Sequence, residues 1–256
     1  MGTTLTIDIG NSSAKIAVFD SELKNGMLFF ERIDNSDLHL LGSIVSDFNP
    51  AHAIVCSTVG FTEQITNAVS SVCKHAIFMD YTTPIPIHNC YKTPETLGMD
   101  RLAAVIGAYG QTQGNTLVID SGTAITYDLV SADGDYLGGN ISPGVDMRFK
   151  ALHEHTAKLP LVTEDGEKPE LGSTTETAIR CGVIEGVKHE ISGVISDFYV
   201  KYPKLYVFLT GGEQLNFATS IKNRIFADDY LVLKGLNMIM QYNIEQNQEN
   251  GRDNND

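Results

Sequence analysis

Alternating apolar and polar residues open the chain and predict a β-strand. Residues 4–9 read Thr-Leu-Thr-Ile-Asp-Ile, the alternation breaks at Gly10, and strand character resumes over residues 14–19. A period of two sends successive side chains to opposite faces of a sheet, as a half-buried strand requires. We therefore expect a strand, a tight turn and a second strand at the start of the chain.

The same pattern returns in the middle of the chain. Residues 117–120 read Leu-Val-Ile-Asp, the run breaks at Gly122, and strand character resumes over residues 125–130. Recurrence of Leu-x-Ile-Asp-x-Gly after roughly 110 residues indicates two copies of one domain rather than a short-period solenoid. The polar and glycine-containing residues 110–116 precede the second copy, and such clusters mark boundaries.

Two segments carry helical periodicity. The first begins at Asp100, and its apolar residues share one helix face: Leu102, Val105, Ile106 and Tyr109. The second begins at Thr174 and carries a longer stripe: Ile179, Val183, Val187, Ile191, Val194 and Phe198. Ser173 and Glu176 have capping-box spacing. Gly182 and Gly186 leave a smooth patch where another helix can approach.

The C-terminal part contains a third strand, residues 205–209, which runs into Thr210-Gly211-Gly212. From about Asn243 the chain is rich in Asn, Gln, Glu and Asp and lacks aromatic residues, so we expect disorder there. The expected domains are residues 1–115 and 116–243, followed by a disordered tail, residues 244–256.

Composition narrows the function. The chain has 256 residues, of which 42% are hydrophobic, and a formal net charge of −14. This acidity argues against nucleic-acid binding and against docking on anionic membranes, because both need clustered Lys and Arg. No apolar run reaches membrane-spanning length. The cysteines form no CxxC pair and are predicted to be reduced, buried thiols of a cytoplasmic protein: Cys56, Cys73, Cys90 and Cys181.

Two glycine turns carry the candidate chemistry. In Asp8-Ile-Gly10-Asn11-Ser12-Ser13, glycine would let the chain turn sharply, so that backbone N–H groups form a nest for phosphate oxygens. Asp8 would hold Mg²⁺ through water. Asp120-Ser-Gly122-Thr123 repeats the arrangement. Taken alone, either turn is equally an ordinary hairpin with an Asx turn.

Two such turns, each near the start of one half of a duplicated chain, indicate a nucleotide site more strongly than either turn alone. With Gly211-Gly212 as a third turn beside a nucleotide base, they are typical of actins, sugar kinases and heat-shock ATPases. We predict an α/β protein of the actin-like ATPase fold, with two duplicated ribonuclease H-like domains and a nucleotide cleft between them. P-loop, Rossmann and protein-kinase motifs are absent from the sequence.

The acceptor substrate is predicted from the start of the first helix. Asp100 and Arg101 are consistent with a capping acid and a solvated base. In a functional interpretation, the planar fork of Arg101 suits a substrate carboxylate. Asp100 could then accept the proton of a substrate hydroxyl during phosphoryl transfer.

The combined motifs resemble those of the type III pantothenate kinases over nearly the whole ordered chain. The motifs are Asp8-Ile-Gly-Asn-Ser12, Thr96-Leu-Gly-Met-Asp-Arg101, Asp120-Ser-Gly-Thr-Ala124, Tyr136-Leu-Gly-Gly-Asn-Ile-Ser-Pro-Gly144, Thr156-Ala-Lys-Leu-Pro160 and Thr174-Thr175. The resemblance implies ATP-dependent phosphorylation of pantothenate to 4′-phosphopantothenate, the first step of coenzyme A synthesis. Ser12 stands where the family often has Thr, and Ser121 where it often has Phe.

The resemblance also implies roles for individual residues. ATP would be bound by Asp8, Ile9, Gly10, Asn11, Ser12, Ser13, Ala14, Lys15 and Thr123. Pantothenate would be bound by Tyr91, Gly98, Met99, Asp100, Arg101 and Thr175, with Asp100 as the proton acceptor. Asp120 would help to bind a monovalent cation, K⁺ or NH₄⁺, beside the Mg²⁺ at Asp8. Lys15 is equally consistent with a solvent-facing strand residue.

The resemblance further implies a homodimer that pairs through the helix from Thr174 and shares its pantothenate pockets between subunits. The apolar stripe could instead be buried within one chain. Two other functions stay open, a kinase for another small hydroxy acid and a non-catalytic regulatory relative such as the Bvg accessory factors. Loss of Asp8, Asp100 or Asp120 would favour the regulator, and all three are present.

Overall fold

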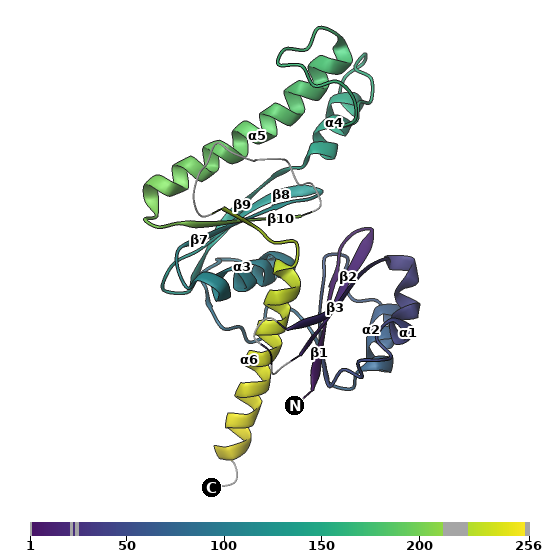
Figure 1. The fold of residues 1–256 in the computed structure, drawn as a ribbon, viewed down its shortest axis with the longest axis vertical. Coiled ribbons are helices and arrows are strands. Elements are labelled where there is room, and N and C mark those ends of the chain that lie inside the picture. Colours follow the sequence, from purple (N-terminus) through teal and green to yellow (C-terminus); the bar gives the residue numbers. More distant parts are fainter. Residues whose placement is uncertain (1, 21–22, 24–25, 212–224, 254–256) are drawn as a thin grey trace. The chain divides into compact units, whose positions relative to one another are not determined.

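The computed structural model describes residues 2–20, 23, 26–211 and 225–253, with the side chains of 249–253 left aside. The chain divides into two compact units (Figure 1). The first unit comprises residues 1–113, 133–137 and 230–256, and the second comprises residues 114–132 and 138–229. Gly212 of the predicted third turn lies outside the described residues.

The first unit is built on a five-stranded sheet of order β3-β2-β1-β4-β5. Its strands are β1 (Thr3–Ile9), β2 (Ser13–Asp20), β3 (Met27–Asp34), β4 (His52–Ser57) and β5 (Ala76–Phe78). β1 pairs antiparallel with β2 and parallel with β4. The predicted strand, turn and strand at the N-terminus are confirmed, and Leu5, Ile7 and Ile9 of the central strand are fully buried.

Helices complete the first unit. They are η1 (Asn35–Leu40), α1 (Leu41–Ile44), α2 (Glu63–Val72), η2 (Pro94–Thr96), α3 (Met99–Thr112) and α6 (Leu231–Asp253). α1 and α2 bury Leu41, Ile65 and Val69 in one core with β1 and β4. α3 and α6 pack closely, because a Cβ added at Gly107 or Gly235 would overlap a backbone carbonyl oxygen of the other helix. The predicted helix from Asp100 is confirmed as α3.

A six-stranded sheet of order β11-β10-β7-β8-β9-β6 includes the strands of the second unit. Its strands are β6 (His88–Asn89), β7 (Thr116–Ser121), β8 (Ala124–Val130), β9 (Asp135–Pro143), β10 (Tyr206–Thr210) and β11 (Ile225–Ala227). β6 and the first residues of β9 belong to the first unit. α4 (Val145–Glu154) and α5 (Thr175–Lys201) contribute to the core of the second unit, where Val187 and Ile191 of α5 are fully buried.

The two sheets share one topology. The order β3-β2-β1-β4-β5 is repeated as β9-β8-β7-β10-β11, with an antiparallel hairpin and then a parallel strand in each case. This repetition confirms the duplication that the recurring Leu-x-Ile-Asp-x-Gly pattern predicted.

The structure corrects the expectation for the C-terminus. The segment predicted to be a disordered tail continues α6 to Asp253, and the whole helix belongs to the first unit rather than the second. Just before this segment, polar side chains of the same helix have partners in the protein. Asn243 is buried and donates to the carbonyl oxygens of Pro84 and Ile239, and Gln241 donates to the hydroxyl of Thr4.

Two smaller expectations are also corrected. The capping box of α5 is formed by Thr174 and Thr177, one residue beyond the predicted Ser173 and Glu176. Cys90 is exposed, whereas the other cysteines are buried as predicted. Within the described part of the chain, no helix has the length and hydropathy needed to cross a membrane.

Candidate active site

Asp8 lies near the end of β1, the central strand of the first unit, and each neighbouring strand places a reactive side chain beside it. Lys15 of β2 and Cys56 of β4 are its partners in register. Side chains directly opposite one another in neighbouring strands share a face of the sheet. The Cys56 thiol donates a hydrogen bond to Asp8 Oδ1, with an Sγ–Oδ1 distance of 3.3 Å.

A second carboxylate, that of Asp100, interacts electrostatically with Asp8. Burial raises the pKa of the Asp8 carboxyl, and so does the charge of Asp100, whereas Lys15 and the Cys56 thiol lower it. Burial also raises the pKa of Cys56 well above its ordinary value, and the Asp8 and Asp100 carboxylates raise it further. The thiol therefore stays protonated as a donor. The structure thus brings the predicted residues Asp8, Lys15 and Asp100 together.

The turn after Asp8 is held by side chains from β3 and η1. Asn35 Nδ2 donates to the carbonyl oxygens of Gly10 at 2.9 Å and Asn11 at 3.2 Å. Arg32 Nε donates to the Ser13 hydroxyl oxygen at 2.9 Å. Asn11 and Ser12, between these anchors, are exposed. The turn is therefore fixed at both ends, with its tip open to a ligand.

Glycine has a different role in these turns from the one expected. Gly10 and Gly122 do not have positive φ, and a Cβ added at either would meet only ordinary van der Waals contacts. The backbone conformation alone does not require glycine at these positions. A missing side chain still leaves room for a ligand to approach the backbone closely.

The second turn is held by backbone packing. A Cβ added at Gly144 would overlap the Gly122 carbonyl oxygen, and one at Gly211, where φ is +101°, would overlap the Ser121 carbonyl oxygen. The Gly144 amide also donates to the Thr123 carbonyl oxygen at 3.1 Å. Three segments of the second unit thus meet at the end of β7.

Asp120 lies at this meeting point. Its Oδ1 is 3.9 Å and 2.6 Å from the positions that a Cβ would take at Gly122 and Gly211. Thr126 of β8 and Thr210 of β10 are its partners in register. The neighbouring Ser121 Oγ is buried without a hydrogen-bond partner among the described residues. The arrangement offers a carboxylate and hydroxyl oxygens, the donor set of a hard cation.

The predicted acceptor segment leads into α3. Gly98 is the N-cap residue, and a Cβ added there would lie 2.5 Å from Asp100 Oδ1. Arg101 is only 8% exposed, so it is not the solvated base of the simpler interpretation. Tyr91 is half-buried, and its ring centroid lies 6.1 Å from that of Tyr136. Tyr91, Met99, Asp100 and Arg101 all belong to the first unit.

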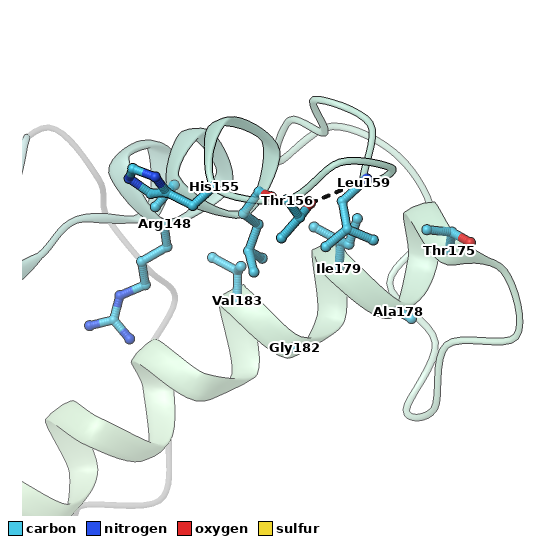
Figure 2. A pocket seen from close by; sticks show the side chains of 11 residues that line it. Arg148, His155, Thr156, Leu159, Thr175, Ala178, Ile179, Gly182 and Val183 are labelled. Carbon is cyan, nitrogen blue, oxygen red and sulfur yellow. Dashed lines mark hydrogen bonds between the residues drawn. The ribbon is translucent and has the colours of Figure 1, made fainter.

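Thr175 belongs to the second unit, at the start of α5. It lines a cavity of about 800 Å³ between α4 and α5, together with residues that include Arg148, Thr156 and Gly182 (Figure 2). Arg148 is held by Glu190 at 2.5 Å and by the Ser142 hydroxyl at 2.7 Å. The cavity is largely apolar, with polar groups along its margin.

The comparison with known proteins decides the family. The model of the type III pantothenate kinase family matches residues 4–197. This chain belongs to that family. A type III pantothenate kinase of Phocaeicola vulgatus is 49% identical over 240 residues, which cover 93% of this chain and 98% of the relative. One from Porphyromonas gingivalis is 42% identical over 251 residues, covering 95% and 100%.

Solved structures support the fold of this family member. A Campylobacter jejuni protein assigned to the Baf family of transcriptional activators has a TM-score of 0.60 at 22% identity, covering 94% of this chain and 99% of that chain. Component A of (R)-2-hydroxyglutaryl-CoA dehydratase from Acidaminococcus fermentans has a TM-score of 0.53 at 12% identity, covering 94% and 97%. At these identities the likeness shows the fold alone, and it confirms the predicted actin-like architecture.

The sequence did not predict the residues that form hydrogen bonds to Asp8 and to the turn that follows it. Cys56 ends an apolar strand and resembles any core cysteine, while Asn35 and Arg32 stand outside every motif. Their roles depend on the register of β4 and β3 against the central hairpin. No local pattern predicts that register.

Proposed function

We propose that this chain transfers the γ-phosphoryl group of ATP to the hydroxyl group of pantothenate, giving 4′-phosphopantothenate and ADP. The observation that carries the proposal is that the charge of Asp100, at the start of α3, acts on the Asp8 carboxyl, which lies opposite Lys15 in the first hairpin. It supports Asp100 as the proton acceptor beside the proposed phosphate site. Membership of the type III pantothenate kinase family supplies the substrate.

In this proposal Asp100 accepts the proton of the pantothenate hydroxyl as the phosphoryl group is transferred. Arg101 binds the pantothenate carboxylate, which its planar fork suits. Tyr91, Gly98 and Met99 bind pantothenate together with Arg101, and Thr175 is also proposed to contact pantothenate.

The turn from Asp8 to Lys15 binds the ATP phosphates, and Thr123 contacts ATP from the second turn. Lys15 supplies one positive charge. Asp8 fits a water-bridged Mg²⁺, because burial and the neighbouring Asp100 charge both raise its pKa and a cation would offset them. When bound, the ion would supply positive charge that neutralises the phosphates. We also propose a cytoplasmic location, because the reaction uses ATP as the phosphoryl donor.

Asp120 is proposed to hold a monovalent cation, K⁺ or NH₄⁺. The hydroxyl-bearing register partners Thr126 and Thr210 support oxygen coordination there. The experiment is to assay turnover in Tris buffer free of K⁺ and NH₄⁺ and then to add K⁺. We expect activation by K⁺, and full activity without either ion would exclude the role.

We also propose a homodimer that pairs along α5. Gly182 and Gly186 are exposed, and a Cβ added at either would meet nothing within 4 Å. This open strip runs beside the cavity that Thr175 lines. Light scattering coupled to size exclusion should give a dimer mass at micromolar protein, and a monomer mass would contradict pairing. Mixing Asp100→Asn with Thr175→Ala chains should restore activity if each site draws on both subunits.

The decisive experiment for the activity is a coupled assay of ADP release. Pantothenate should support turnover, whereas matched hydroxy acids without its amide-linked carboxylate arm should not. Turnover with another acid alone would favour a kinase of different specificity. ATP binding without turnover on any acceptor would favour a non-catalytic relative.

A further inference from the structure

We propose that His88, Cys90 and Asp135 form a binding site for a thiophilic divalent metal ion of the Zn²⁺ class. The site lies where β6 meets the first residues of β9, within the first unit. It shares no residue with the cation sites predicted at Asp8 and Asp120. It also explains the one cysteine, Cys90, that is exposed rather than buried.

Strand geometry assembles the three side chains. β6 pairs parallel with β9 and places His88 directly opposite Asp135. The amides of His88 and Cys90 donate to the carbonyl oxygens of Gly134 at 2.9 Å and Tyr136 at 3.0 Å, which fixes this register. Residues two apart on an extended segment share one face. His88, Cys90 and Asp135 are therefore held on the same side of the strand pair.

The ligand atoms already lie near the spacing that a tetrahedral ion needs. His88 Nδ1 is 3.0 Å from Asp135 Oδ1 and 3.4 Å from Cys90 Sγ, and all three atoms lie within 4.8 Å of one another. Zn²⁺ bonds of about 2.0–2.3 Å at tetrahedral angles put ligand atoms about 3.3–3.6 Å apart. An ion would bind if the distance from His88 Nδ1 to Asp135 Oδ1 increased by a few tenths of an ångström and Cys90 Sγ moved closer to Asp135 Oδ1.

The chemistry of the three ligands selects the metal. Thiolate and imidazole favour Zn²⁺ and Co²⁺ over Mg²⁺ and Ca²⁺, which prefer oxygen. Access is open, since the side chains of His88 and Asp135 are 76% and 39% exposed. Binding displaces the Cys90 thiol proton to solvent and replaces the bond between His88 Nδ1 and Asp135 with bonds to the metal. Three protein ligands leave the fourth position to water.

A bound ion would clamp β6 to β9. Tyr91 follows Cys90 directly, and its ring lies 6.1 Å from that of Tyr136 on β9. The clamp would therefore hold the strand pair that carries Tyr91. An ion that binds the folded state more tightly than the unfolded chain also raises the melting temperature.

Cobalt titration of the untagged full-length protein, reduced and treated with a chelator, tests the site. We expect one Co²⁺ per chain, with a thiolate-to-cobalt charge-transfer band and the visible bands of four-coordinate cobalt. One equivalent of Zn²⁺ should remove both. The readout does not depend on kinase activity, so failure of the metal site and failure of the proposed function are distinguishable.

Substitutions of the three proposed ligands test where the ion binds. Cys90→Ser should abolish the charge-transfer band. His88→Gln and Asp135→Asn should weaken Co²⁺ binding at least about 100-fold, because loss of even an outer partner of a metal ligand costs about 10–100-fold. Two controls should leave binding unchanged: His39→Gln, at an exposed histidine elsewhere, and Cys73→Ser, at a buried thiol.

Circular dichroism and thermal melting of each apo variant establish that it is folded before titration. No charge-transfer band in the wild-type protein, with Co²⁺ in micromolar excess, would overturn the proposal and leave an ordinary His–Asp pair beside a thiol. A band that survives in Cys90→Ser would also overturn it.

Discussion

The two duplicated hairpins carry the same carboxylate in different surroundings. In the first unit, Asp8 lies opposite Lys15 and accepts a hydrogen bond from the buried thiol of Cys56. In the second unit, the register partners of Asp120 are the hydroxyl-bearing Thr126 and Thr210. The first carboxylate therefore has a lysine opposite it, whereas the second has threonine hydroxyl groups opposite it. The same duplicated backbone thus gives its two carboxylates different electrostatic surroundings.

The turns that follow these carboxylates are also fixed differently. Asn35 and Arg32 hold the first turn through side-chain hydrogen bonds. Gly144 and Gly211 hold the second through backbone contacts that leave no room for a Cβ. Side-chain anchors can be removed one bond at a time, whereas a backbone contact is lost only when the chain shifts. The two halves should therefore respond differently to substitution.

The largest effect is expected at Asp100, which joins Asp8 and Lys15 in the first half. Asp100→Asn should lower kcat by about 10²–10⁴-fold, because it removes the proton acceptor. ATP binding, measured by calorimetry, should be retained. A kcat within about threefold of wild type would remove Asp100 from catalysis.

In the second unit, substitution of Asp120 should change the dependence of activity on K⁺. Asp120→Asn should raise the K⁺ concentration needed for half-maximal activation by about 10–100-fold, since it weakens an ion ligand. Activation curves at saturating ATP and pantothenate measure the change. An unaltered K⁺ curve in a folded variant would place the cation elsewhere.

Backbone packing of the second turn predicts a cost in stability. Gly144→Ala should lower the free energy of unfolding by about 1–3 kcal/mol, as overpacking does. Gly193→Ala is the matched control, because a Cβ there meets nothing within 4 Å in the middle of α5. Alanine favours a helix interior, so the control should be neutral or stabilising. Urea denaturation compares the two, and equal effects would refute the packing argument.

Arg101→Lys should weaken binding of pantothenate rather than binding of ATP. Lysine keeps the charge but loses the bidentate fork, so the KM for pantothenate should rise about 10-fold and the KM for ATP should change little. Steady-state kinetics with each substrate varied in turn measures both constants. A rise confined to ATP would mean that this segment faces the nucleotide.

The smallest effect is expected where side chains hold the first turn. Asn35→Ala removes two hydrogen bonds, each contributing about 1 kcal/mol, and should raise the KM for ATP severalfold while sparing kcat. Asn67→Ala, at an exposed position of α2, is the matched control. Identical ATP constants for the two variants would show that Asn35 does not order the turn.

Local patterns were sufficient for much of this molecule. Strand patterns interrupted by glycine turns predicted β1, β2, β7 and β8, and helical periodicity predicted α3 and α5. Recurrence of Leu-x-Ile-Asp-x-Gly predicted the duplicated topology, because each copy carries its own hydrophobic period and glycine turn. Near neighbours in sequence set these features, so the sequence alone determined them.

Only the tertiary structure decided which distant groups meet. Cys56 lies beside Asp8 because β4 pairs parallel with β1 in one register, and a shift of one residue would turn the thiol to the opposite face. Asn243 and Gln241 of α6, just before its polar end, bond to remote parts of the chain. Cys90 becomes a potential metal ligand only because β6 pairs with β9. Contacts between segments far apart in sequence determine these features, and local composition does not encode them.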